Sequence, residues 1–121
     1  MHRKPSFLPW ILDIPSLTLV TIAVIPAGEK WRADNSLRFA LEDLVGAGAI
    51  IGHLKGSLSP EAQLALAAFS SVHEDLTIAL KGCSSGKELI EKGFEWDVSV
   101  SAEEDADECA PFLKDGTFRR Y

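Results

Sequence analysis

Cysteine and histidine are scarce in this chain of 121 residues, which contains two cysteines and three histidines. No Cys-x-x-Cys or His-x-x-x-His pair occurs, whereas a structural zinc site normally takes four such ligands. Cys83 and Cys109 are also too few for a disulfide scaffold. These shortages argue against a zinc-stabilised or disulfide-stabilised domain, and we expect two reduced thiols.

Positive charge is also in short supply. Twelve Lys and Arg stand against 18 Asp and Glu, so the formal net charge is −6. Nucleic-acid binding needs clustered cations to meet the phosphates, and we therefore expect no nucleic-acid partner. With 46% hydrophobic and 25% charged residues, the composition is that of one globular domain.

Long hydrophobic runs are missing as well. The most apolar stretch, residues 17–25, ends at Pro26 and is shorter than the roughly 20 residues that a membrane span needs. Basic residues at positions 2–4 precede it, as in a signal peptide, but several prolines and Asp13 interrupt the segment. We therefore expect no membrane association and a cytoplasmic location.

The pattern of the chain predicts an α/β fold with one main strand followed by about four helices. Residues 17–25 are rich in β-branched side chains, which favours a buried strand. Apolar residues then recur at helical spacing over residues 37–54, with Leu37, Leu41, Leu44 and Ile51 expected in the core. Further helices are predicted at residues 59–72 and 74–81 and from residue 85 to Gly93, while residues 94–101 fit a helix or a strand. A short strand at 111–113 precedes an Asp-Gly turn.

Three charged residues are the first candidates for chemistry. In the predicted helix Arg38 and Glu42 are four residues apart, so they share a face and can form an ion pair. Asp43 points about 100° further round, toward small residues of the next turn. Two adjacent carboxylates beside small residues can hold a hard cation such as Mg²⁺. They can equally be an exposed acidic pair, and the spacing alone favours that interpretation.

A second candidate is the segment of residues 84–87, Ser-Ser-Gly-Lys. Free amides and Lys87 at a helix start could bind an anion. Ser85 and Glu88 also have the spacing of a capping box, and this simpler interpretation is favoured by the signature alone.

Several segments, in this order, resemble the 2-phosphosulfolactate phosphatase family of the coenzyme M pathway. The resemblance covers roughly residues 17–119, and the order of its segments is more specific than any one of them. The matching segments are 24–31 (Val-Ile-Pro-Ala-Gly-Glu-Lys-Trp), 36–38 (Ser-Leu-Arg), 41–51 (Leu-Glu-Asp-Leu-Val-Gly-Ala-Gly-Ala-Ile-Ile), 58–62 (Leu-Ser-Pro-Glu-Ala), 85–90 (Ser-Gly-Lys-Glu-Leu-Ile) with Gly93-Phe94, and Pro111 with 114–116 (Lys-Asp-Gly).

This resemblance implies a magnesium-dependent α/β phosphatase that cleaves 2-phosphosulfolactate, a small anionic phosphate ester, into sulfolactate and phosphate. It implies that Glu42 and Asp43, as the catalytic and metal-binding residues, contact the metal or water at the substrate, and it leaves open whether water or an enzyme carboxylate attacks phosphorus. Arg38, and more weakly Lys87, would bind the substrate. We divide the chain into an irregular, unmatched segment, residues 1–16, and a domain over residues 17–121 that corresponds to the carboxyl-terminal lobe of the phosphatase.

The family's amino-terminal half is not found in these residues, including its Asp-Val-Leu-Arg-Ala-Thr-Thr and Gly-Asn-Ser-Pro segments. We therefore expect a truncated form that needs the missing half, or self-association, and that is inactive alone. The alternative function is a non-enzymatic fragment whose fold is completed by a partner chain. A helical interaction domain would be favoured if residues 17–25 were helical or disordered.

Overall fold

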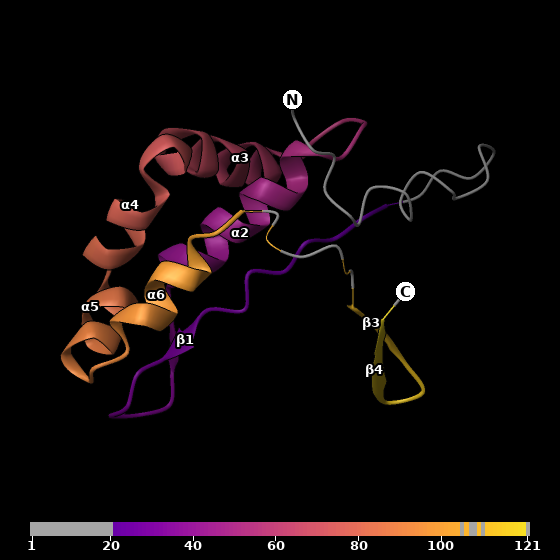
Figure 1. Cartoon of the computed structure of the whole chain (residues 1–121). Helices are drawn as coiled ribbons and strands as arrows, with labels where there is room; N and C mark the ends of the chain where they lie inside the picture. Colours follow the sequence, from indigo (N-terminus) through magenta and orange to yellow (C-terminus); the bar gives the residue numbers. More distant parts are fainter. Residues whose placement is uncertain (1–20, 105, 107–108, 110, 121) are drawn as a thin grey trace. The chain divides into compact units, whose positions relative to one another are not determined.

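A computed structural model describes residues 21–104, 106, 109 and 111–120 of the chain (Figure 1). The chain divides into two units, and one of them is the continuous segment Ile22–Ala102. The other unit includes Glu103–Tyr121, which contains a β-hairpin. Each unit is described by itself, and the candidate site lies within Ile22–Ala102.

The predicted strand over residues 17–25 is not present in its described part. Residues 17–20 lie outside the described residues, and residues 21–25 have no regular secondary structure. The first described strands are β1 (Glu29–Lys30) and β2 (Leu37–Arg38), which pair antiparallel with Glu29 opposite Arg38. A stretch of β-branched residues becomes a strand only when another backbone meets its amide and carbonyl groups. Among the described residues, no strand pairs with this segment.

A tight turn joins β1 to β2 where the sequence predicted a helix start. The Oδ1 atom of Asp34 accepts hydrogen bonds from the amide of Ser36 at 2.9 Å and from its hydroxyl at 2.6 Å. Asn35 has a φ of 60°, in the left-handed region that asparagine tolerates. These side chains therefore bend the backbone back on itself instead of capping a helix, and the predicted burial of Leu37 is wrong because this residue is 73% exposed in β2.

The helix predicted over residues 37–54 is α2 (Leu41–Gly52), and it packs along α3 (Pro60–Val72) (Figure 1). Ile51 is buried as expected, together with Val45 and Ala47, whereas Leu41 and Leu44 are half-buried. Gly48 allows the close approach of the two helices, since a Cβ atom placed there would lie 2.1 Å from the carbonyl oxygen of Ala65. Helix packing therefore explains the glycine at position 48.

The predicted limits of the later helices are largely confirmed. Ser59 caps α3 by accepting a hydrogen bond from the amide of Ala62 at 3.3 Å, directly before Pro60. A short 3₁₀ turn, η1 (His73–Asp75), leads into α4 (Leu76–Gly82), which buries Leu80. The ambiguous segment after residue 93 is helical, as α6 (Glu95–Ser101).

The helix α5 (Ser84–Glu91) begins two residues earlier than the capping box predicted, so the prediction of Ser85 as its N-cap is wrong. Its N-cap is Cys83, whose Sγ atom accepts a hydrogen bond from the amide of Gly86 at 3.4 Å. The predicted end is confirmed, because Gly93 has a φ of 86° and donates to Ile90 while Phe94 donates to Leu89. This pair of hydrogen bonds is a Schellman motif.

The second unit contains the antiparallel hairpin of β3 (Pro111–Lys114) and β4 (Thr117–Arg120). Asp115 and Gly116 both have positive φ values, 52° and 74°, as a two-residue hairpin turn requires. The predicted strand and turn are therefore confirmed. With short antiparallel ribbons and several helices, the chain has the mixed α/β class that the sequence predicted. The longest described helix, α3, has 13 residues, and none of the described helices could cross a membrane.

Candidate functional site

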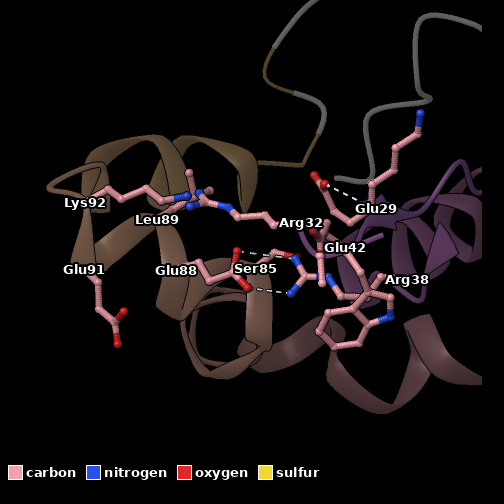
Figure 2. A pocket seen from close by; sticks show the side chains of 12 residues that line it. Glu29, Arg32, Arg38, Glu42, Ser85, Glu88, Leu89, Glu91 and Lys92 are labelled. Atoms are coloured by element: carbon pink, nitrogen blue, oxygen red, sulfur yellow. Dashed lines mark hydrogen bonds and ion pairs between the residues drawn. The ribbon is translucent and has the colours of Figure 1, made fainter. Parts of the chain in front are cut away.

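A cleft of about 720 Å³ lies between the β1–β2 ribbon, the start of α2 and helix α5 (Figure 2). Its lining carries four cationic and four carboxylate side chains, so its formal charge balances. The lining residues are Glu29, Lys30, Trp31, Arg32, Ala33, Arg38, Glu42, Ser85, Glu88, Leu89, Glu91 and Lys92.

Arg38 is paired with Glu88 at the centre of this cleft (Figure 2). The Nη1 atom of Arg38 lies 2.5 Å from Oε1 of Glu88, and Nη2 lies 3.5 Å from Oε2. The predicted pairing of Arg38 with Glu42 on one helix is wrong, because Arg38 belongs to β2 and Glu42 to α2. The carboxylate meets both terminal nitrogens of the guanidinium, which is the bidentate arrangement that makes such pairs strong and directional.

The two members of this pair differ in their exposure. The side chain of Arg38 is 10% exposed and that of Glu88 is 45% exposed. The Arg38 guanidinium carbon also lies 5.2 Å from the centre of the Trp31 ring, within the range of a cation–π contact. Arg38 is therefore held by its surroundings, whereas the carboxylate that meets it is open to solvent.

The ion pair changes the acidity of both partners. The hydrogen bond from Arg38 holds the pKa of the Glu88 carboxyl below its usual value, and the nearby charges of Lys92 and Arg32 act in the same direction. The same bond raises the pKa of Arg38. Glu88 does not satisfy the whole guanidinium, because the buried Nε atom of Arg38 has no hydrogen-bond partner among the described residues.

Glu42 and Asp43, the predicted metal ligands, have different surroundings. Glu42 lines the cleft, and its Oε2 atom lies 3.8 Å from the Sγ atom of Cys83. Asp43 is not among the lining residues, and its Oδ2 atom accepts a hydrogen bond of 2.6 Å from the amide of Gly28. Mg²⁺ is typically held by one or two carboxylates and keeps several waters. Glu42, at the cleft, fits such a role, whereas the structure holds Asp43 at the Gly28 amide and outside the cleft lining.

In the part of the chain that the structure describes, no three Asp, Glu, His or Cys side chains converge as a metal centre would require. The donor set thus suits a hydrated hard cation better than a metal enclosed by protein ligands.

Only part of the predicted anion site at residues 84–87 lines the cleft. Ser85 lines the cleft, whereas Lys87 is exposed on α5 and is not among the lining residues. The cations that do line it beside Arg38 are Lys30, Arg32 and Lys92. The sequence motif therefore identified the helix that contributes to the cleft, but its lysine is not one of the lining cations.

Two residues of the site were missed by sequence reasoning. Trp31 was not proposed for the site and Glu88 was assigned to a capping box, yet both contact the Arg38 guanidinium. Arg38 and Glu88 are 50 residues apart, and no local pattern joins residues at that separation. The one local signal for the site was that Trp31 precedes Arg38 by only seven residues. A tryptophan and an arginine at such a separation are too common to predict a contact between them.

Comparison with known proteins identifies relatives over most of the chain. Residues 18–116 match the sequence model of the family described as 2-phosphosulpholactate phosphatase. Two curated relatives, from Thermotoga petrophila and Thermotoga maritima, are each named "Probable 2-phosphosulfolactate phosphatase". Each is 39% identical over 87 residues, which are 71% of this chain and 38% of the relative. The chain therefore matches less than half of the length of these relatives. No solved structure gives a significant match.

Proposed function

Because the chain belongs to the 2-phosphosulpholactate phosphatase family, we propose that it provides the anion-binding part of an enzyme that hydrolyses 2-phosphosulfolactate. The observation that supports this most directly is the position of Arg38, nine-tenths buried and directed into a cleft that contains three further cations. Arginine suits this role because its planar guanidinium stays charged and presents paired donors to an oxyanion.

The proposed substrate carries three anionic groups: a phosphate ester, a sulfonate and a carboxylate. An extended, highly charged ligand of this kind needs several cations at separate points rather than one. Arg38, Arg32 and Lys92 are spread over the lining, and Lys30 extends from β1. These residues would bind and orient the substrate, and so fix the phosphoryl group for attack.

Magnesium is the second part of the proposal, with Glu42 and Asp43 as the residues that would hold it. When bound, Mg²⁺ would neutralise phosphoryl charge and orient water at the phosphorus. The carboxylate of Glu42 would otherwise repel the phosphoryl group, and a cation beside it would offset this repulsion. Glu42 and Asp43 are the proposed catalytic residues, since they would contact the water that attacks.

In the proposed reaction a water oxygen forms the new bond to phosphorus while the ester P–O bond breaks. The leaving alkoxide takes a proton and becomes the hydroxyl group of sulfolactate. As in the family, this reaction would serve coenzyme M biosynthesis, and we place it in the cytoplasm.

A second candidate function is that of a fragment completed by a partner chain. Ile25, Leu37 and Phe39 are exposed in the segment that leads into α2, where a larger α/β protein would cover them. The chain matches only 38% of its curated relatives, so their remaining part is the natural candidate to cover this surface.

The decisive experiment measures phosphate release from 2-phosphosulfolactate with Mg²⁺. The chain is assayed alone and after co-expression with the part of a Thermotoga relative that it does not match. We expect turnover from the complex and its loss in Arg38→Ala, while the exposed Lys55→Ala serves as the control. A stable complex that binds no 2-phosphosulfolactate in calorimetry and releases no phosphate would contradict the proposed function.

A further inference from the structure

The Arg38–Glu88 pair combines a fixed cation with a movable anion. Arg38 is 10% exposed and packs against Trp31, whereas Glu88 projects from α5 and is 45% exposed. Breaking the pair would leave Arg38 in place with its terminal nitrogens unpaired, while Glu88 could turn into solvent. The two terminal nitrogens of Arg38 thus form a fork of donors that suits an oxyanion. In the free protein this fork is occupied by the carboxylate of Glu88.

Glu88 is an imperfect occupant of this fork. Its two oxygens are used on Nη1 and Nη2, and the buried Nε atom of Arg38 finds no acceptor among the described residues. An unpaired buried N–H group costs free energy because it has lost its water without gaining a partner. The phosphate ester and the sulfonate of the proposed substrate each have three terminal oxygens, so either group could accept from Nε as well as from a terminal nitrogen once the carboxylate has left.

We propose that Glu88 is an internal competitor for the oxyanion site, and that a tetrahedral oxyanion of the substrate displaces it from Arg38. This inference rests on the proposed function for the identity of the substrate, but its geometry is independent of turnover. Displacement also removes a carboxylate from the centre of a cleft that must accept an anionic ligand. Lys92 and Arg32, whose charges act on the Glu88 carboxyl in the free protein, then remain available to the ligand.

The size of the effect follows from the occupancy of the fork. If Glu88 occupies it about nine-tenths of the time, the apparent affinity for an external oxyanion falls about tenfold, in proportion to the free fraction. Removing the charge of Glu88 would restore that affinity, provided that Arg38 keeps its place on Trp31.

The test is calorimetric binding of inorganic phosphate, methanesulfonate and acetate to the full chain. We expect Glu88→Gln to lower the Kd for the tetrahedral ions about tenfold. Glu91→Gln is the matched control, because Glu91 lies on the same helix and lines the same cleft without an ion pair in the described residues. It should change the Kd by no more than about twofold, as expected for a distant, solvent-screened charge. Phosphate and methanesulfonate distinguish which group of the substrate reaches Arg38, and a gain confined to acetate would contradict a tetrahedral ligand.

A further pair of variants separates competition from a structural role. Glu88→Asp keeps the charge but shortens the reach, so it should also tighten oxyanion binding. Adding Arg38→Met to Glu88→Gln should remove the whole gain. Weaker binding in Glu88→Gln, or equal effects of Glu88→Gln and Glu91→Gln, would overturn the inference. Tighter phosphate binding without any 2-phosphosulfolactate binding would instead retain the oxyanion site and reject the proposed substrate.

Discussion

The backbone amide of Gly28 donates a hydrogen bond of 2.6 Å to the Oδ2 atom of Asp43, fifteen residues further along the chain. Gly28 has a φ of 75°, and a Cβ atom at this position would lie 2.9 Å from the carbonyl oxygen of Arg38. This contact ties the loop before β1 to the first turn of α2. Asp43 therefore has a positioning role in addition to the proposed metal contact, and experiments on it must separate the two.

The magnesium proposal predicts that Glu42→Gln and Asp43→Asn each weaken Mg²⁺ binding in calorimetry. Asparagine keeps a carbonyl oxygen that can accept from Gly28, so Asp43→Asn removes charge while it preserves the loop. Asp43→Ala should lose both, which a lower unfolding midpoint would reveal. Asp75→Asn, at an exposed carboxylate of η1, is the control. Equal heats for the wild type and the Glu42→Gln/Asp43→Asn double variant would contradict a metal-binding role for these two carboxylates.

The contact between α2 and α3 predicts opposite effects for two alanine substitutions in one helix. Gly48→Ala places a methyl group against the backbone of Ala65 and should destabilise the chain by about 1–3 kcal/mol, as overpacking does. At Gly46, which is exposed, no atom lies within 4 Å of an added Cβ. Gly46→Ala should therefore be stabilising by up to about 1 kcal/mol through helix propensity. Urea denaturation of both variants measures this difference, and equal effects would contradict the close approach of the helices.

Structure formed by neighbouring residues was predictable from the sequence. Ser59 and Pro60 predicted the start of α3, and Gly93 predicted the end of α5. The Asp-Gly turn predicted the hairpin. Each of these signals acts on residues only a few positions away. The start of α2 was predicted four residues too early, since Asp34 and Ser36 serve a turn as readily as a helix cap.

The candidate site was only partly predictable, for a different reason. Arg38 and Glu42 were identified, and both line the cleft. The predicted ion pair between Arg38 and Glu42 was wrong, because Arg38 pairs with Glu88 on α5. That contact depends on how α5 packs against the rest of the unit, and not on spacing along one helix. A single sequence contains no information on which of the surrounding carboxylates such an arginine meets.

The Glu88 ion pair predicts a defined dependence of stability on pH. Because the hydrogen bond from Arg38 lowers the folded-state pKa of Glu88 below its usual value of 4.5, the folded state binds this proton less readily than the unfolded state. The stabilisation is therefore complete above about pH 4.5 and is lost as the pH falls through the lowered pKa. The free energy of unfolding of the wild type should exceed that of Glu88→Gln near pH 7, and the gap should close as the pH falls below 4.5.

Urea titrations at several pH values provide the measurement. Glu91→Gln, which also removes one negative charge from α5, is measured in parallel as the control. If the gap between the wild type and Glu88→Gln stayed constant across this range, the ion pair would not contribute to folding.

The exposed apolar residues before α2 predict that the chain alone self-associates and hydrolyses phosphate esters poorly. Ile25 is 82% exposed, Leu37 73% and Phe39 68%, in a segment of 15 residues. Exposed apolar side chains of this kind favour association, because burying them releases ordered water. Phosphoryl transfer also needs charged groups to converge on one phosphate with bulk water excluded, and the cleft is open and evenly balanced in charge. Light scattering after gel filtration should show oligomers of the wild-type chain, and the Leu37→Gln/Phe39→Gln variant should be monomeric.

Leu64→Gln, at an equally exposed leucine on α3, is the control and should leave the oligomers intact. Rapid hydrolysis of 2-phosphosulfolactate by a stable monomer would show that these residues suffice without a second lobe or a second copy.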